Sequence, residues 1–451
     1  MKIAHAPLLL AALSCAASLA QAQVRCIDED NAAVAPPASA AATATPEGSP
    51  RERLSAMVRN ALERSHAVGA SALLAEAALS DIDEARAALE VQSTMTLSLG
   101  PEGSRTDSVS RASALRGSGS LQFAQTIYDG GRTRRLVDWR TELSRAARHG
   151  QVSMQEQVAA STVALALERS RFRQQAFVYA QYVRKMSCLS QALESIVAAD
   201  RGRASELVQA RKSLQTAELA LAQSQSQLRQ VEVRLRRVVG QELPSAEGLS
   251  TALLEVPDLD SALWSAAQSP QIEQLTAQSL AAERLARSAE LAMVPKLSWL
   301  LEGSARQSRG GYIDEERNAA ASFGVSLDIP LHNPSLLPAS ESARKRARAA
   351  VMQRDDALEA RRTRIAEAHE QATASFDRAR RVSAVLRDSE QLRSFTLQQW
   401  QQLGRRSLFD VMNAEAEHYN LRVQYVNALH DGQQLNVVLQ SLGRGVGEWL
   451  R

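Results

Sequence analysis

The most constraining feature of this chain is an internal repeat. The turn Gly202-Arg203-Ala204-Ser205 returns as Gly404-Arg405-Arg406-Ser407, and each turn is followed by a row of mostly apolar residues spaced alternately three and four apart. The first row is Leu207, Ala210, Leu214, Ala217, Leu221, Ser224, Leu228, Val231, Leu235 and Val238; the second is Val411, Ala414, His418, Leu421, Tyr425, Ala428, Gly432, Leu435, Leu439 and Leu442. Every member of the second row lies 204 positions after its counterpart (411 − 207 = 204). The pattern predicts one long coiled-coil unit used twice.

The composition agrees with long helices, because 45% of the 451 residues are hydrophobic but only 4% are aromatic. A formal net charge of +3 is too small to indicate nucleic-acid binding, and no basic run is interleaved with aromatic residues. The repeat of ~200 residues favours one body of two homologous halves over three ordinary domains.

The N-terminus reads as an export signal. Lys2, the apolar stretch from Leu8 to Leu19 and the sequence Ala20-Gln21-Ala22 predict a secretory signal peptide over residues 1–22. A lipoprotein site at Cys15 is the alternative, but Ala12 stands where a larger aliphatic residue is expected. Residues 23–50, rich in Ala and Pro, predict a linker.

Cleavage after Ala22 would leave two cysteines, Cys26 and Cys188. An exported compartment is oxidising, so these two residues are a candidate disulfide. Two unpaired thiols, with Cys188 as a small residue within a helix, are the alternative interpretation.

The apolar period changes from helical to alternating in each half. Residues 51 to about 91 have a helical pattern, followed by two expected strands on either side of an exposed loop at roughly 101–116. The alternating apolar residues there are Met95, Leu97 and Leu99, then Leu121, Phe123 and Ile127. The second half repeats this with Leu297, Trp299 and Leu301, a loop around Ser304–Asn318, and Phe323, Val325, Leu327 and Ile329. The halves are predicted at 51–245 and 246–451.

Each returning strand is followed by a helix far longer than globular domains use. The expected bounds are about Arg134–Asp200 and Ser342–Leu403, each ~60–70 residues and so ~90–100 Å long. Both helices would turn at Gly202 or Gly404 and return along the apolar rows.

A membrane role would depend on the strands, since no apolar run of the mature chain approaches the ~20 residues that a membrane helix needs. Four strands are too few to close a barrel, which takes about eight. The sequence therefore predicts an oligomer whose subunits share one barrel.

In their order and repetition, these motifs resemble the TolC family of outer-membrane channel-tunnels. The resemblance covers about residues 51–445 and includes the turns Tyr128-Asp129-Gly130-Gly131 and Pro330-Leu331 after the returning strands. It implies a mainly α fold with a β-barrel part: a homotrimer with a twelve-stranded barrel in the Gram-negative outer membrane and a helical tunnel in the periplasm. It implies no cofactor, and as partners a periplasmic adaptor, an inner-membrane transporter and outer-membrane lipid. The function implied is passive exit in tripartite efflux or type I secretion.

The resemblance also assigns residues. Gly202, Arg203, Ser205, Gly404, Arg405 and Ser407 match the tips that meet the adaptor. Asp410 matches an acidic ring at the tunnel mouth, where Asn413 replaces a second common acid. Glu206 and Arg406 fall where the family links neighbouring coils at the closed tip. Without the resemblance, these charges read as solvated positions on a coil surface.

Enzymatic chemistry has no support in the sequence. The histidines His5, His66, His149, His332, His369, His418 and His430 are scattered without metal-ligand spacing. His418 falls in the second apolar row, which predicts a buried polar position that sets the register of the coil. A soluble periplasmic coiled-coil adaptor or structural protein is the alternative function, and it leaves both strand pairs unexplained.

Overall fold

The computed structural model describes residues 48–104, 112–310, 313–403 and 406–451. These residues form two compact units. The first unit contains the residues up to Ser65 together with Gln155–Ala266 and Arg362–Arg451; the second contains His66–Met154 and Ala267–Arg361. Each unit therefore combines segments from both halves of the sequence.

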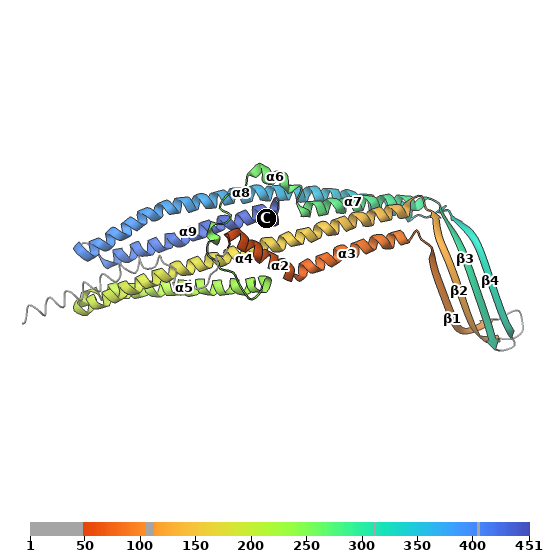
Figure 1. Ribbon diagram of the computed structural model, residues 1–451, viewed down its shortest axis with the longest axis horizontal. Helices are drawn as coiled ribbons and strands as arrows, with labels where there is room; N and C mark the ends of the chain where they lie inside the picture. Colours follow the sequence, from red (N-terminus) through yellow and green to blue (C-terminus); the bar gives the residue numbers. More distant parts are fainter. Residues whose placement is uncertain (1–47, 105–111, 311–312, 404–405) are drawn as a thin grey trace, which may run out of the picture. The chain divides into compact units, whose positions relative to one another are not determined.

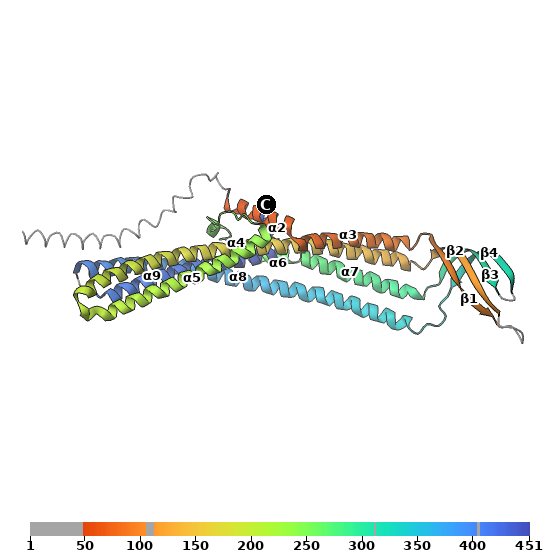
Figure 2. The same cartoon turned by 90° about the horizontal axis from the view of Figure 1, so that it is seen from below.

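Four long helices carry the predicted coiled-coil pattern. They are α4 (Arg132–Ala199), α5 (Ala204–Val239), α8 (Leu336–Leu403) and α9 (Leu408–Leu442). In the first unit, α4 lies beside α5 and α8 beside α9, and the two connecting turns lie at the same end (Figures 1 and 2). The predicted long helices are confirmed, with bounds that differ by a few residues, and so is the turn at Gly202; Gly404 lies outside the described residues.

The remaining helices are short. They are α2 (Pro50–Arg64), α3 (His66–Ala87), α6 (Leu259–Ala266), α7 (Pro270–Glu290) and α10 (Val446–Leu450), with 3₁₀ turns η2 (Arg201–Arg203), η3 (Leu249–Thr251) and η4 (Leu291–Met293). The helical pattern from residue 51 to about 91 is not one helix, because Ser65 adopts an extended conformation between α2 and α3.

The second unit contains one antiparallel sheet in the order β1-β2-β3-β4. Its strands are β1 (Gln92–Ser104), β2 (Ala112–Tyr128), β3 (Lys296–Gly310) and β4 (Ile313–Asp328). The predicted loops at 101–116 and Ser304–Asn318 were too long, since the ladder continues through most of both. Their Ser, Gly and Arg residues lack apolar alternation, but backbone hydrogen bonds do not require it.

The first unit has an apolar core at two levels. One cluster joins α2, α4, α5, α9 and α10 through residues such as Leu54, Leu167, Leu235 and Val437. The second cluster lies near the helical turns and contains Met186, Leu189, Leu193, Ala210, Leu397, Leu408, Val411 and Met412 from α4, α5, α8 and α9. We call this second group the tip cluster. It packs the ends of both hairpins together.

Candidate functional site

The sheet has one apolar face. The register places Met95 opposite Leu121, Phe123 opposite Leu301, and Leu301 opposite Phe323. Its members are Met95, Leu97, Leu99, Leu115, Leu121, Phe123, Leu297, Trp299, Leu301, Phe323, Val325 and Leu327. Leu97, Leu99 and Phe323 are 72%, 75% and 72% exposed in the protomer. Side chains of this kind need an apolar partner, which the described residues of the protomer do not supply.

The opposite face is polar and rich in hydroxyl groups. It carries Thr94, Thr96, Ser98, Ser118, Ser120, Gln122, Ser298, Glu302, Ser304, Arg306, Ser322 and Ser326. The Ser98 and Ser118 hydroxyls lie 2.7 Å apart across the β1–β2 pair. The alternation predicted from the sequence therefore produces a sheet with one apolar face and one polar face.

One amide interrupts the apolar face close to the helices. Gln125 donates to the Leu89 carbonyl (2.9 Å) and accepts from the Trp299 indole N–H (3.0 Å). The Trp299 ring also lies near Phe323, with centroids 6.4 Å apart. Aromatic residues thus border the apolar face at this end.

The first helical turn is held by its own side chains. The Gly202 N–H donates to Asp200 Oδ1 (3.0 Å), which caps η2. Arg203 donates to both carboxylate oxygens of Glu206 (3.2 and 2.9 Å). Glu206, the sequence candidate for a link to a neighbouring coil, thus has a partner on its own hairpin.

The second turn uses a capping box. The Asp410 N–H donates to Ser407 Oγ (3.2 Å), and the Ser407 N–H donates to Asp410 Oδ2 (3.3 Å). Asp410, the candidate gate acid, therefore also caps α9, while Asn413 is exposed. Arg406 donates to Gln399 of its own hairpin (3.2 Å). Gly404 and Arg405 lie outside the described residues.

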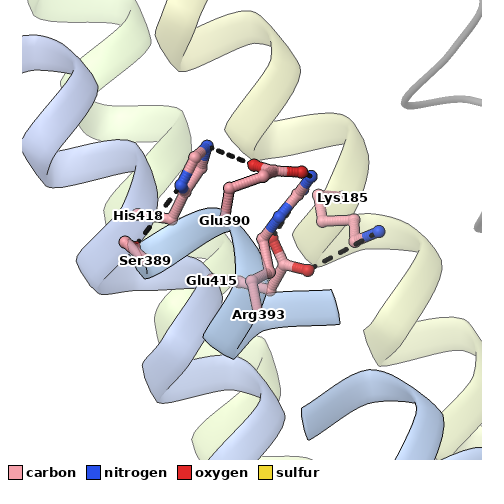
Figure 3. A network of polar contacts seen from close by, with 6 residues as sticks. All are labelled: Lys185, Ser389, Glu390, Arg393, Glu415 and His418. Carbon is pink, nitrogen blue, oxygen red and sulfur yellow. Dashed lines mark hydrogen bonds and ion pairs between the residues drawn. The ribbon is translucent and has the colours of Figure 1, made fainter. Parts of the chain in front are cut away.

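A charged network lies behind these turns (Figure 3). Glu415 of α9 has one carboxylate oxygen 3.6 Å from Lys185 Nζ of α4 and accepts at the other from Arg393 of α8 (3.3 Å). Arg393 also donates to Glu390 (2.6 Å), and Glu390 lies 3.3 Å from Nε2 of His418. Nδ1 of His418 is 3.4 Å from the Ser389 hydroxyl. We call these six residues the charge network.

The charge network is largely buried. The side chains of Glu415, Lys185 and His418 are 0%, 3% and 7% exposed, whereas Glu390 is 51% exposed. Burial and the Glu415 carboxylate both raise the pKa of the Tyr182 hydroxyl above its usual range. The buried position predicted for His418 is confirmed. Lys185, Arg393 and Glu415 were not anticipated, because long helices carry many such charges on solvated faces.

Cys188 lies in α4, one turn from Lys185, and is disulfide-bonded. Cys26, its candidate partner, lies outside the described residues, so the pairing stays a prediction.

Among the residues that the structure describes, no group of three or more His, Cys, Asp or Glu side chains is placed to hold a metal ion. No helix among the described residues has a stretch long and apolar enough to cross a membrane.

A comparison with protein families matches residues 57–241 to the outer membrane efflux protein family. The chain is similar to outer membrane efflux proteins. The match includes the first strand pair and the first helical hairpin, and it confirms the resemblance to the TolC family seen in the sequence. No curated protein matches the chain in a sequence comparison.

Solved structures of such proteins share the fold along most of the chain. CusC, described in a study of transmembrane channel formation, matches with a TM-score of 0.77 at 16% identity, covering 87% of this chain and 92% of that one. The outer membrane protein VceC from Vibrio cholerae matches with a TM-score of 0.72 at 19% identity, covering 86% and 96%. The CmeC outer membrane channel of Campylobacter jejuni matches with a TM-score of 0.72 at 14% identity, covering 87% and 85%.

Proposed function

We propose that this protein is a passive exit channel in the outer membrane, working in tripartite efflux or type I secretion. The two-faced sheet is the observation that carries this proposal. An apolar face on which Leu97, Leu99 and Phe323 are 72–75% exposed suits a lipid environment, and a face of hydroxyl groups suits a water-filled path. A soluble coiled-coil adaptor would gain nothing from exposing Leu97, Leu99 and Phe323.

The channel is a homotrimer in this proposal. The edge strands β1 and β4 present unpaired backbone groups along one side each, and such edges have to be covered or paired. Pairing β4 of one copy with β1 of the next would give twelve strands from three copies. Their polar faces would then enclose the path.

The helical hairpins form the periplasmic tunnel in this proposal. A helix of 68 residues such as α4 or α8 is ~100 Å long, which suits reach across a compartment. The two turns would meet a periplasmic adaptor, which receives cargo from an inner-membrane transporter. Asp410, repeated three times, would form the acidic ring that narrows the tunnel mouth.

Single-channel recording of the purified mature protein in a planar bilayer tests the proposal, after its oligomer mass has been measured. Discrete, long-lived conductance steps from a trimer support it. A monomer that does not insert would contradict it and favour the soluble coiled-coil adaptor.

Two variants separate the roles of the second turn. Asp410→Asn removes the charge but keeps a capping oxygen, and should weaken block by multivalent cations and raise conductance. Ser407→Ala weakens the cap but keeps the charge, and should leave cation block unchanged. Equal block in Asp410→Asn and the wild type would refute the gate assignment.

A bulky residue at Gly404 should impair export while trimers persist; normal export would refute the tip assignment.

A further inference from the structure

The sheet of the second unit leads into long helices through two connections. β2 ends at Tyr128 and α4 begins at Arg132, while β4 ends at Asp328 and α8 begins at Leu336. Both helices begin at the same end of the sheet, within the second unit (Figures 1 and 2). This end of the sheet is therefore bordered by the first turns of α4 and α8.

Exposed apolar side chains continue the apolar face of the sheet into both connections. Ile127 and Ile329 continue the two-residue alternation of β2 and β4 and are 57% and 52% exposed. Leu331, in the connection to α8, is 91% exposed, and Leu337, in the first turn of α8, is 66% exposed. Side chains of this kind suit the boundary between the acyl chains and the headgroups of a membrane.

Basic side chains follow the apolar ones on α8. The packed side of this part of the helix consists of small residues three or four positions apart, which are Ser340, Ala343, Ala347 and Ala350. The exposed side carries four cations, which are Arg344, Lys345, Arg346 and Arg348. Arg344 pairs with Glu290 of α7 (2.5 Å), and Lys345 lies 4.0 Å from Glu341. Among the described residues, Arg346 and Arg348 have no ion-pair partner.

The first turn of α4 is also basic and contains no acidic residue. Cations there face the positive end of the helix dipole, which disfavours them. The carboxylate of Asp129 caps the helix instead, since it accepts from the Gly131 and Thr133 N–H groups (2.9 and 2.7 Å). Arg134 is exposed and has no ion-pair partner in the part of the chain that the structure describes. The stability of α4 therefore does not explain Arg134, whereas an external anion would.

The direction of these side chains brings their charges toward the sheet. Side chains on a helix tilt toward its N-terminus, and α4 and α8 both have their N-termini beside the sheet. Arg346 and Arg348 follow Leu337 by 9 and 11 residues (346 − 337 = 9; 348 − 337 = 11), which is ~14–17 Å along the helix. A long Arg side chain extends back over part of this distance. The charges therefore lie within reach of a layer just beyond the apolar face.

We propose that Arg134, Lys345, Arg346 and Arg348 form a basic collar that binds the headgroups of anionic phospholipids in the leaflet nearest the helices. The collar rests on the proposed channel function, which places the apolar face of the sheet in lipid. Guanidinium groups donate to two phosphate oxygens at once, so phosphodiester headgroups fit them. Headgroups without net charge would gain little from the collar, because the attraction of basic side chains depends on a negative surface potential.

Fluorescence quenching in lipid vesicles tests the collar. The purified mature protein is placed in phosphatidylcholine vesicles that also contain brominated phosphatidylglycerol or brominated phosphatidylcholine. Quenching of Trp299, at the helix end of the apolar face, measures the binding of each brominated lipid, and Trp299→Phe identifies its share of the signal. The wild type should favour the anionic lipid by about fivefold or more, since one basic side chain near an anionic leaflet contributes about that factor.

Charge-removing variants locate the preference. Arg134→Gln with Arg346→Gln and Arg348→Gln should abolish it, and the corresponding three Arg→Lys changes should retain it. The matched control is Lys212→Gln with Arg229→Gln and Arg237→Gln, which removes three exposed cations from α5 and should leave the preference unchanged. An unchanged preference in the collar variant, or an equal loss in the α5 variant, would overturn the collar.

Free phosphate is distinguished from lipid by competition. Inorganic phosphate, added at constant ionic strength, should leave the preference unchanged, because the collar acts on a charged surface and is not a closed pocket. Loss of the preference would indicate a site for a small anion and overturn the collar as a lipid-binding surface.

The two proposals can fail separately. Equal quenching of wild-type Trp299 by the two brominated lipids would overturn the collar and leave the channel standing. Absence of quenching by either lipid would show that the apolar face is not in the membrane, and would overturn the channel together with the collar.

Discussion

Helices α5 and α9 occupy matching places in the repeat but are buried very differently. In the protomer α5 has six buried residues: Ala210, Ala217, Ser224, Val231, Leu235 and Val239. They follow one narrow stripe, mostly seven residues apart. In α9 sixteen residues are buried, and they include Glu415, His418, His430, Gln433 and Asn436. A shared sequence pattern therefore gives one helix with a single seam and another that is covered on several sides.

The polar residues of α9 show what the extra burial does. Gln433 donates to the Leu249 carbonyl (3.0 Å), and Asn436 donates to the carbonyls of Leu253 and Glu255 (2.7 and 3.1 Å). These bonds reach backbone carbonyls of η3 and of the residues that follow it. In the second copy of the repeat, α9 therefore also holds other segments of the chain through its polar side chains. In the first copy, α5 packs through a single coiled-coil seam.

The largest expected effect on stability comes from removing Glu415, a buried charge of α9 that has no buried counterpart in α5. Glu415→Ala should lower the free energy of unfolding by about 3–5 kcal/mol, because it breaks the buried ion pair with Lys185 by removing one of its charges. The matched change Glu194→Ala, in an exposed pair near the turn of the other hairpin, should cost less than about 1 kcal/mol. Denaturant unfolding in detergent measures both, and equal costs would contradict the contrast.

The second expected effect is a dependence of the stability on pH, which comes from His430. Burial lowers the pKa of this imidazole from 6.5 to about 4, so it stays neutral in the folded protein. Because the pKa of this base is lower in the folded state than in the unfolded state, the folded protein has its full stability above pH 6.5. The unfolded state takes up a proton first as the pH falls, so that stability is lost toward pH 4. The shift corresponds to about 3 kcal/mol.

Thermal unfolding between pH 7 and 4 measures this loss. His430→Leu should flatten the pH profile, and the exposed His66→Gln should not. A wild-type profile that is flat over this range would contradict the assignment.

The third effect concerns close packing around α9. A Cβ on Gly432 would lie 2.8 Å from the Phe376 ring of α8. Gly432→Ala should therefore cost about 1–3 kcal/mol, despite the better helix propensity of Ala. Gly69→Ala in α3 meets no atom within 4 Å and should be neutral or slightly stabilising. Adding Phe376→Leu should recover part of the Gly432→Ala loss; no recovery would place the strain elsewhere.

The smallest expected effect on stability comes from removing the helix caps at the two turns. Ser407→Ala removes the hydroxyl that caps α9, and Asp200→Ala removes the carboxylate that caps η2. Each should cost about 1 kcal/mol, with the larger loss at Ser407 because it opens a reciprocal capping box before a 35-residue helix. Hydrogen exchange at the first turns of α5 and α9 reports each cap locally. A larger loss of protection in α5 would reverse the expected order.

Local sequence signals predicted most of this fold. The long helices, the turn at Gly202 and the alternating strand cores depend on nearby residues, and the structure confirms them. The strand ends were underestimated, because residues such as Ser304 and Arg306 pair through their backbones. The charge network could not be predicted, since Lys185 and Glu415 are 230 positions apart (415 − 185 = 230) and only the packing of α4 with α9 joins them. The capping role of Asp410 was readable from Ser407 three residues earlier.

The Gln125–Trp299 hydrogen bond also marks one end of the apolar stretch of β2. Along β2, the apolar face extends from Leu115 to Phe123 and then meets this polar pair. Eight residue steps at ~3.4 Å give ~27 Å along the strand, or ~21 Å along the membrane normal for a strand tilted by about 40°. An average bilayer has a hydrocarbon core of about 30 Å, and the bacterial outer membrane is thinner. In the proposed orientation, the apolar face along β2 suits a thin membrane, and a thicker membrane would have to become thinner around it.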